Sequence, residues 1–344
     1  MSYTNGLDKP SDYFNTKLYT GNGSTQSITG VGFKPDWNWI KRRNTADSHR
    51  IQDSVRGSTK YLSSNSTDNE VDAGSVSSFD TDGFTLSSSD SKYNGSGSTY
   101  ASWNWLASNT TASNTDGSIT STVSANTTSG FSIVNWTHNG GNSTIGHGLG
   151  VAPKVIITKE RNNTGSWNSY FSAVGNGHRM VLQGTNAKIS SSIWNSTNPT
   201  STVFSMNDSI TSTMIAYCFA DVKGYSKFGS YTGNGSTDGT FVYTGFKPAF
   251  TIIKRTDATD NWFIQDNIRQ ANANFDGNPV NIVIQGDFTN AETNASSRSV
   301  DYLSNGFKIR TTNGGWNASG GNFIYMAFAE NPFVTSTGIP CTAR

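Results

Sequence analysis

The chain contains copies of itself. The heptapeptide Tyr-Thr-Gly-Asn-Gly-Ser-Thr fills residues 19–25 and returns letter for letter at residues 231–237. Such repetition indicates an array of modules. Because the copies show which residue types each position accepts, they act as internal controls for any candidate site. Three further motifs follow both copies in the same order: Gly-Phe-Lys-Pro at 32–35 and 245–248, Ile-Lys-Arg at 40–42 and 253–255, and Ile-Gln-Asp at 51–53 and 264–266.

A more divergent third copy lies between these two. Residues 136–144 stand in place of the heptapeptide, and Gly-Val-Ala-Pro at 150–153 and an Ile-Ile-Thr-Lys segment at 156–159 follow. Units of roughly 90 residues are close to the size of an independent β-sandwich. We predict an N-terminal arm at 1–12, modules at 13–107, 131–222 and 223–334, a polar linker at 108–130 and a C-terminal tail at 335–344.

The apolar segments are short and rich in β-branched residues, as at Val155–Thr158 and Phe250–Ile253, and turn residues bound most of them. Nine Trp, 13 Tyr and 19 Phe supply enough buriable area for a folded protein despite the many Gly, Ser, Thr and Asn. The sequence therefore predicts an all-β fold of three tandem antiparallel β-sandwich modules, jelly-roll-like in character.

Charge and hydropathy disfavour two classes of partner. Only 14% of the residues are charged and the formal net charge is +1, so nothing in the composition favours nucleic acid. No segment approaches the roughly 20 apolar residues of a membrane span, and no signal peptide is recognisable at the N-terminus. We expect synthesis in the cytoplasm without a signal peptide, and no membrane insertion.

Two tryptophan pairs, Trp37 with Trp39 and Trp103 with Trp105, could form a sugar-stacking platform because alternate residues of a strand share a face. The copies argue against this use. Other large apolar residues replace them in the second and third copies, so we expect packed core positions instead. The replacements are Val155, Ile157, Tyr217 and Phe219 in the second copy, and Phe250, Ile252, Met326 and Phe328 in the third.

A lysine recurs in every copy, as Lys41, Lys159 and Lys254. Its strand parity places it at the core-facing edge of its strand, where a buried ammonium needs a partner. We predict structural ion pairs between Lys41 and Asp53 and between Lys254 and Asp266. A reactive lysine is the alternative, but no nucleophile or carbonyl-binding arrangement accompanies it.

Five aromatic residues remain as candidates for receptor or glycan binding. Tyr93 and Trp316 precede an Asn in the turn before the closing strand, where a packed turn is the alternative to an exposed contact. Trp167, Trp194 and Trp262 lie in or near Asn- and Ser-rich segments and have no equivalents that the copies reveal.

No catalytic residue, metal site or cofactor is predicted. The four histidines have no metal-ligand spacing, the acidic residues form no recurring pair, and neither a nucleophile elbow nor a phosphate-binding loop occurs. A polysaccharide-degrading enzyme would need two carboxylates facing each other across a groove, which no motif here indicates.

The repeated motifs resemble a module widespread in virion proteins of tailed bacteriophages, notably marine ones. The resemblance rests on Tyr-Thr-Gly-Asn-Gly, on Gly-Phe-Lys-Pro leading to Ile-Lys-Arg, on Asp82–Phe84 and Asn305–Phe307, and on the ending Tyr325–Phe333. It implies a structural protein on the exterior of the particle, often of the tail-fibre type, and it supplies no catalytic residues. No heptad or collagen-like stretch for a trimeric shaft occurs.

The sequence thus predicts a non-enzymatic phage virion protein, most simply a compact tail-fibre-type adhesin for host attachment. A capsid or tail decoration protein is the close alternative, and a polysaccharide-degrading enzyme is the third. Expected partners are other virion proteins and a host cell-surface glycan, with an oligomer in the virion possible. The three modules could form a row or a closed pseudo-threefold ring.

Overall fold

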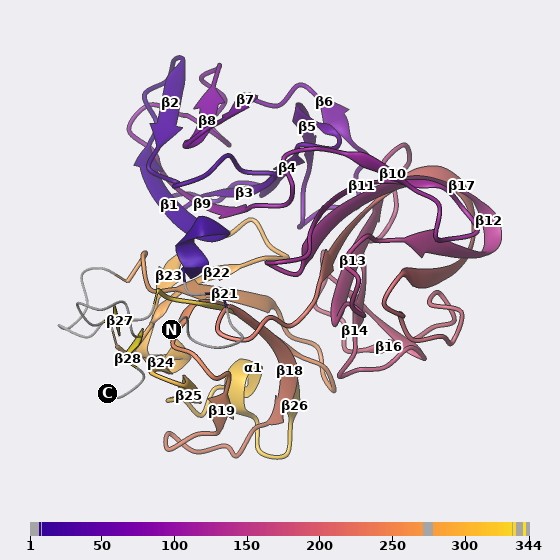
Figure 1. Cartoon of the computed structure of the whole chain (residues 1–344). Coiled ribbons are helices and arrows are strands. Elements are labelled where there is room, and N and C mark those ends of the chain that lie inside the picture. The colour runs from indigo at the N-terminus through magenta and orange to yellow at the C-terminus, as the bar shows by residue number, and fades with distance from the viewer. Residues whose placement is uncertain (1–6, 8, 271–277, 332, 335–339, 342–344) are drawn as a thin grey trace.

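The computed structural model describes residues 7, 9–270, 278–331, 333–334 and 340–341, and in these residues the chain is almost entirely β (Figure 1). Within this described part of the chain, helical segments are confined to η1 (Pro10–Asp12), η2 (Ser296–Arg298) and α1 (Gly314–Asn317). None of the described helices is long and apolar enough to cross a membrane. The predicted N-terminal arm and C-terminal tail lie largely outside the described residues, although β27 (Phe333–Val334) pairs with β28 (Pro340–Cys341).

Module 1 is a sandwich of two antiparallel sheets. Its inner sheet contains, in spatial order, β1 (Phe14–Thr20), β9 (Thr99–Trp105), β3 (Trp37–Arg42), β4 (Arg50–Asp53), β5 (Gly57–Leu62) and β6 (Val71–Asp72). Its outer sheet contains β2 (Gln26–Thr29), β8 (Gly83–Leu86) and β7 (Val76–Asp80). A cluster of buried side chains that includes Tyr19, Ile40 and Phe84 fills the space between the sheets.

Module 3 has the same topology. Its inner sheet contains β18 (Ser226–Thr232), β26 (Asn322–Ala329), β20 (Pro248–Arg255), β21 (Trp262–Asp266), β22 (Ile282–Gln285) and β23 (Thr293–Asn294). Its outer sheet contains β19 (Phe241–Tyr243), β25 (Gly306–Ile309) and β24 (Val300–Leu303). The all-β sandwich class predicted from the sequence is therefore confirmed.

Module 2 achieves the same layering with one eight-stranded sheet, in the order β10 (Ala112–Asn114), β11 (Ser121–Asn126), β12 (Phe131–Gly146), β17 (Val203–Phe219), β13 (Val155–Glu160), β14 (Asn168–Phe171), β15 (His178–Val181) and β16 (Ile189–Ser190). The two long strands curve over, so that Val134 and Ile145 from opposite ends of β12 meet in one buried cluster. The segment 108–130, which we predicted to be a linker, instead contributes β10 and β11 to this sheet. The composition of this segment, rich in Ser, Thr and Asn, concealed two strands that pair with each other and with β12 as successive antiparallel neighbours.

The repeated heptapeptide has a structural explanation in both copies. The Tyr19 hydroxyl donates to the carbonyl of residue 93 at 2.8 Å, and the Tyr231 hydroxyl donates to that of residue 316 at the same distance. A Cβ at Gly21 would lie 2.4 Å from the backbone oxygen of residue 95, so only glycine allows this approach. In modules 1 and 3 the motif therefore holds the first strand against the turn that precedes the closing strand.

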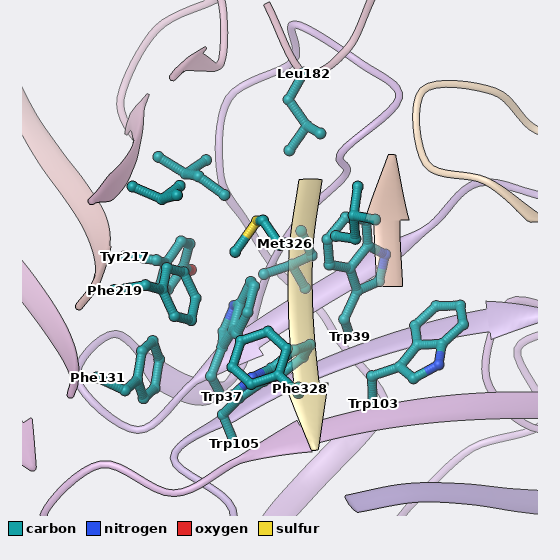
Figure 2. Close-up of a cluster of buried hydrophobic side chains, with 14 of the residues drawn as sticks. Trp37, Trp39, Trp103, Trp105, Phe131, Leu182, Tyr217, Phe219, Met326 and Phe328 are labelled. Carbon is teal, nitrogen blue, oxygen red and sulfur yellow. The ribbon is translucent and has the colours of Figure 1, made fainter. Parts of the chain in front are cut away.

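The three inner sheets face a common centre, which makes the modules a closed ring with pseudo-threefold symmetry. Figure 1 shows the outer layers as three lobes around that centre. Trp105, Phe219 and Phe328 occupy equivalent positions in the three closing strands, and their rings lie 5.6–6.5 Å apart in each pair. They belong to one buried cluster drawn from all three modules (Figure 2). The predicted core role of the tryptophan pairs is confirmed, but the core is shared by the whole chain.

Three equivalent segments, residues 63–70, 181–188 and 285–292, close the ring, and we call them the clasp loops. The first loop follows β5, and the second and third begin at the last residues of β15 and β22. Each loop contacts the next module of the ring. The carbonyl of a threonine in each loop accepts a backbone N–H from that module: Thr67 from Gly165, Thr185 from Asp260 and Thr289 from Asp47, at 2.8–2.9 Å. Three further backbone bonds of 2.8 Å repeat the pattern, from Glu70 to Arg161, Lys188 to Thr256 and Glu292 to Arg43.

The shared core predicts cooperative unfolding. Replacing Phe328 with Ala should lower the free energy of unfolding by about 3–5 kcal/mol, because the ring leaves a cavity that all three modules line. Scanning calorimetry should give one transition for the native chain and one, at lower temperature, for the variant. Tyr243→Thr, at an exposed position, is the control and should change stability by less than about 0.5 kcal/mol. Separate loss of module 3 alone would contradict the shared core.

Candidate functional site

The five aromatic residues predicted to bind a receptor are all buried, with exposed fractions of 2% or less. Tyr93 and Trp316 lie between the two sheets of modules 1 and 3. There the Tyr93 hydroxyl accepts a hydrogen bond from the Gln52 amide, and Trp316 donates to Gln265. Trp194 packs edge-on against Tyr170 in module 2. The prediction was wrong because these turns fold back over the sandwich, where a large ring is needed to fill space.

Trp167 and Trp262 are equivalent to each other and to His49, a relation the sequence comparison missed. His49 and Trp167 stand immediately before β4 and β14, and Trp262 is the first residue of β21. The side chain of each residue donates to a clasp loop of a neighbouring module. The Trp167 indole bonds the carbonyl of Ser63 at 2.9 Å, and the Trp262 indole bonds that of Val181 at 3.0 Å. The Ile-Gln-Asp motif, which follows both His49 and Trp262, carried the signal for this alignment.

The His49 ring makes the equivalent contact with the clasp loop of module 3. Its Nδ1 accepts from the Trp39 indole, which leaves Nε2–H to donate to the carbonyl of Gln285 at 2.9 Å. Burial holds the pKa of His49 well below its usual value, so the ring is neutral at physiological pH. Its role is to join modules 1 and 3.

The predicted ion pairs Lys41–Asp53 and Lys254–Asp266 are also wrong. Asp53 lies opposite Trp37 in the strand ladder, four residues from Lys41, which corresponds to about 13 Å. Asp53 pairs instead with Arg56, and the Arg269 Nε lies 2.6 Å from Asp266, all four side chains being fully buried. The error arose because strand parity identifies the face of the sheet on which a side chain lies but not its position along the strand.

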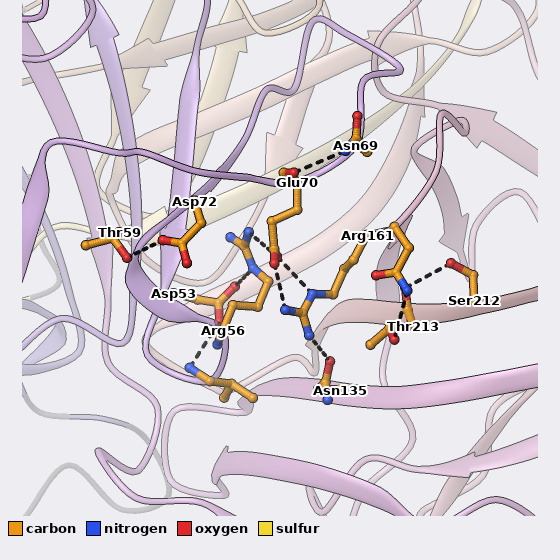
Figure 3. Close-up of polar contacts among 12 residues, drawn as sticks. Asp53, Arg56, Thr59, Asn69, Glu70, Asp72, Asn135, Arg161, Ser212 and Thr213 are labelled. Carbon is orange, nitrogen blue, oxygen red and sulfur yellow. Dashed lines mark hydrogen bonds and ion pairs between the residues drawn. The ribbon is translucent and has the colours of Figure 1, made fainter.

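These ion pairs extend across the module boundaries. Arg56 also contacts Glu70, and Glu70 forms a two-pronged ion pair with Arg161 of module 2 (Figure 3). The Tyr217 hydroxyl of module 2 donates to Asp53 at 2.7 Å. At the boundary of modules 3 and 1, the equivalent set is Asp266, Arg269, Glu292 and Arg43, with the Trp103 indole donating to Asp266. The boundary of modules 2 and 3 has Phe171 and Val174 in place of the Asp and Arg.

The three recurrent lysines have a structural role at the same boundaries. Each ammonium donates to the backbone carbonyl of the residue that follows it, and Lys159 and Lys254 also donate to the threonine carbonyls of the adjacent clasp loops at 3.2 and 3.3 Å. Burial lowers the pKa of each lysine to about 8. The ammonium groups thus donate hydrogen bonds to backbone carbonyls at the ends of the inner strands and in the clasp loops.

An open pocket of about 340 Å³ lies where the three clasp loops meet. Equivalent polar residues line it from each module, and all three accept a backbone N–H within their own module: Asn65 from His49, Gln183 from Trp167 and Asp287 from Trp262. Burial raises the pKa of the Asp287 carboxyl. Gly184, Thr185, Phe288 and Thr289 complete the lining.

Phe288 is the exception to the symmetry of this pocket. Its side chain is 50% exposed, and the equivalent positions of modules 1 and 2 carry Ser66 and Gly184. The polar residues around it are explained by the hydrogen bonds that shape the clasp loops, whereas no packing requirement explains an exposed phenyl ring. Sequence reasoning missed Phe288 because the three clasp loops share only a threonine.

The chain is therefore an all-β protein whose three modules form one ring with an axial pocket. A family model described as a domain of unknown function, DUF7483, matches residues 9–332, and the chain belongs to this family. The match covers all three modules as one unit, in agreement with their shared core. No curated protein and no solved structure matches the chain.

The lysine environments predict a pH dependence. In the unfolded chain these lysines would titrate near 10.5, so between about pH 8 and 10.5 the unfolded state binds more protons than the folded state. Stability should rise with pH over this window through the three lysines. We expect the native chain to gain stability relative to the variant K41M/K159M/K254M when both are unfolded with urea at pH 7.5 and pH 9.5. Parallel pH curves for the two proteins would contradict the burial of charged ammonium groups.

Proposed function

We propose that this chain is a non-enzymatic structural protein exposed on the exterior of a tailed-phage particle, and that it attaches the particle to its host by binding a cell-surface glycan. The observation that carries the proposal is the axial pocket with Phe288 exposed inside it. The resemblance of the repeated motifs to virion modules supports the location on the particle.

The chemistry of the pocket suits a sugar. An exposed phenyl ring offers an apolar face against which the C–H face of a pyranose can stack. Amide, hydroxyl and carboxylate groups of Asn65, Gln183, Thr185, Thr289 and Asp287 line the same hollow and are the groups that bind sugar hydroxyls. Its volume of about 340 Å³ lies at the lower end of the range of ligand pockets.

The ring also supports a role outside the cell. The central strands of its inner sheets are buried, and the ion pairs of Asp53 with Arg56 and of Asp266 with Arg269 are fully buried and poorly screened by salt, so the ring depends little on ionic conditions. A rigid ring with one axial pocket presents that pocket in a fixed orientation.

Decoration of the capsid or tail is the second candidate, and the pseudo-threefold symmetry favours it. A ring of three similar modules fits a threefold position formed by other virion proteins, and one chain there would match three partner surfaces. Antibody labelling of intact particles distinguishes the two: label on the tail supports attachment, and label spread over the capsid supports decoration.

The attachment proposal predicts that Phe288 matters for cell binding. Replacing it with Ser, the residue of module 1, should weaken binding of the purified protein to host cells about tenfold, because one stacking contact is lost. The measurement is flow cytometry with fluorescently labelled protein, competed by polysaccharide extracted from the same cells. Val151→Ser removes an equally exposed apolar side chain elsewhere and should leave binding unchanged. Equal binding by both variants would reject the pocket as the receptor site.

A further inference from the structure

Two aromatic side chains are exposed together on the outer sheet of module 3. Phe241 and Tyr243 alternate on β19 and have exposed fractions of 42% and 65%, while Val242 between them is buried. Alternate residues of a strand share a face, so both rings stand on the solvent side of this sheet. The ladder of β19 with β25 sets their neighbours, with Phe241 opposite Lys308 and Tyr243 opposite Gly306.

Module 1 shows that the fold does not require these rings. The equivalent strand β2 pairs with β8 in the same register and carries Ser27 and Thr29 at the two positions. Gly83 of module 1 matches Gly306, and in each case a Cβ would lie 2.0–2.1 Å from a carbonyl oxygen of the partner strand. The glycine is therefore explained by the backbone in both modules, and covering it with an aromatic ring is unnecessary.

Both rings lie against backbone that has no side chain. A Cβ built at Gly306 would be 3.0 Å from Cζ of Phe241, and one built at Gly245 would be 3.5 Å from the hydroxyl oxygen of Tyr243. Each ring thus rests on a glycine, which leaves its outer face to solvent. Positions two apart on a strand are roughly 7 Å apart, a spacing within the span of a disaccharide.

A polar rim without excess charge lies beside the rings. The Lys308 ammonium is 2.6 Å from Asp238, and Arg310 bridges Asp238 and Asp301. Two cations and two anions balance, so the rim offers donors and acceptors to sugar hydroxyls without favouring an anionic ligand. The two rings together expose well under the roughly 800 Å² per partner that a stable protein interface needs.

We propose that the solvent face of β19, with Phe241 and Tyr243, is a second carbohydrate site that stacks consecutive residues of a neutral polysaccharide. It deepens the proposed attachment function, on which it rests, and it is separate from the axial pocket. The rings supply the stacking surface, and Lys308, Asp238 and Arg310 hydrogen-bond the hydroxyls at the edge.

Affinity electrophoresis tests the site. The full chain is run through native gels that contain dextran, yeast mannan or laminarin as neutral polysaccharides, or alginate as an anionic one. We expect retardation by at least one neutral polysaccharide, and a fall of about tenfold or more in apparent affinity for the double variant F241S/Y243T. The variant carries the residue types that module 1 has at these positions, so its melting temperature should match that of the native chain.

Matched variants separate this site from the axial pocket. S27A/T29A changes the equivalent face of module 1 and should leave retardation unchanged, while S27F/T29Y should strengthen it by adding a second platform. Retardation that survives F241S/Y243T but is lost in F288S would overturn the β19 site and leave the attachment function standing. The absence of retardation by every neutral polysaccharide would also overturn it. A change of F241S/Y243T in oligomeric state by light scattering would assign the rings to contact between copies of the chain.

Discussion

The contact of three equivalent aromatic rings at the centre of the molecule is the constraint on which the remaining architecture depends. Trp105, Phe219 and Phe328 each project from the inner face of a sheet whose other face is already covered by an outer layer. A single module would leave that inner face, with several large side chains, in water. Burying one such side chain is worth about 1.5–3 kcal/mol, so association of the three modules is strongly favoured. The ring is the arrangement in which all three inner faces are covered at once.

Burial of the core also leaves backbone polar groups at the ends of the inner strands in need of hydrogen-bond partners. The clasp loops supply these partners with backbone hydrogen bonds that repeat at all three boundaries. The side chains added to that frame differ from boundary to boundary. Two boundaries contain buried carboxylate–guanidinium pairs, and the third contains Phe171 and Val174. Buried ion pairs contribute little net stability compared with apolar packing, so either solution closes the ring. Because the three modules are unequal parts of a single chain, the side chains that close each boundary can differ.

The sequence contained the strands and the internal copies, and from these the all-β sandwich class and the buried tryptophan pairs could be predicted. It did not reveal where the long-range partners lie. Trp167 and Trp262 were expected at the surface because they sit among polar residues, yet each donates to a clasp loop of another module. Lys41 was paired with Asp53 by face alone, although the register separates them. The sequence signal for the shared core lies in runs such as Val155–Thr158 and Phe250–Ile253, which do not alternate and are thus typical of strands buried on both faces.

Comparing the modules in space locates function more sharply than comparing them in sequence. Residues that recur at equivalent positions are accounted for by core packing, clasp-loop bonds or close backbone approach. The exposed aromatic residues Phe288, Phe241 and Tyr243 have small or polar counterparts, and the fold does not need them. A homotrimer would display each of these residues three times, whereas this chain displays each once. Multivalent binding to a cell surface would therefore come from several chains on one particle, or from two distinct sites on one chain, rather than from the symmetry of the ring.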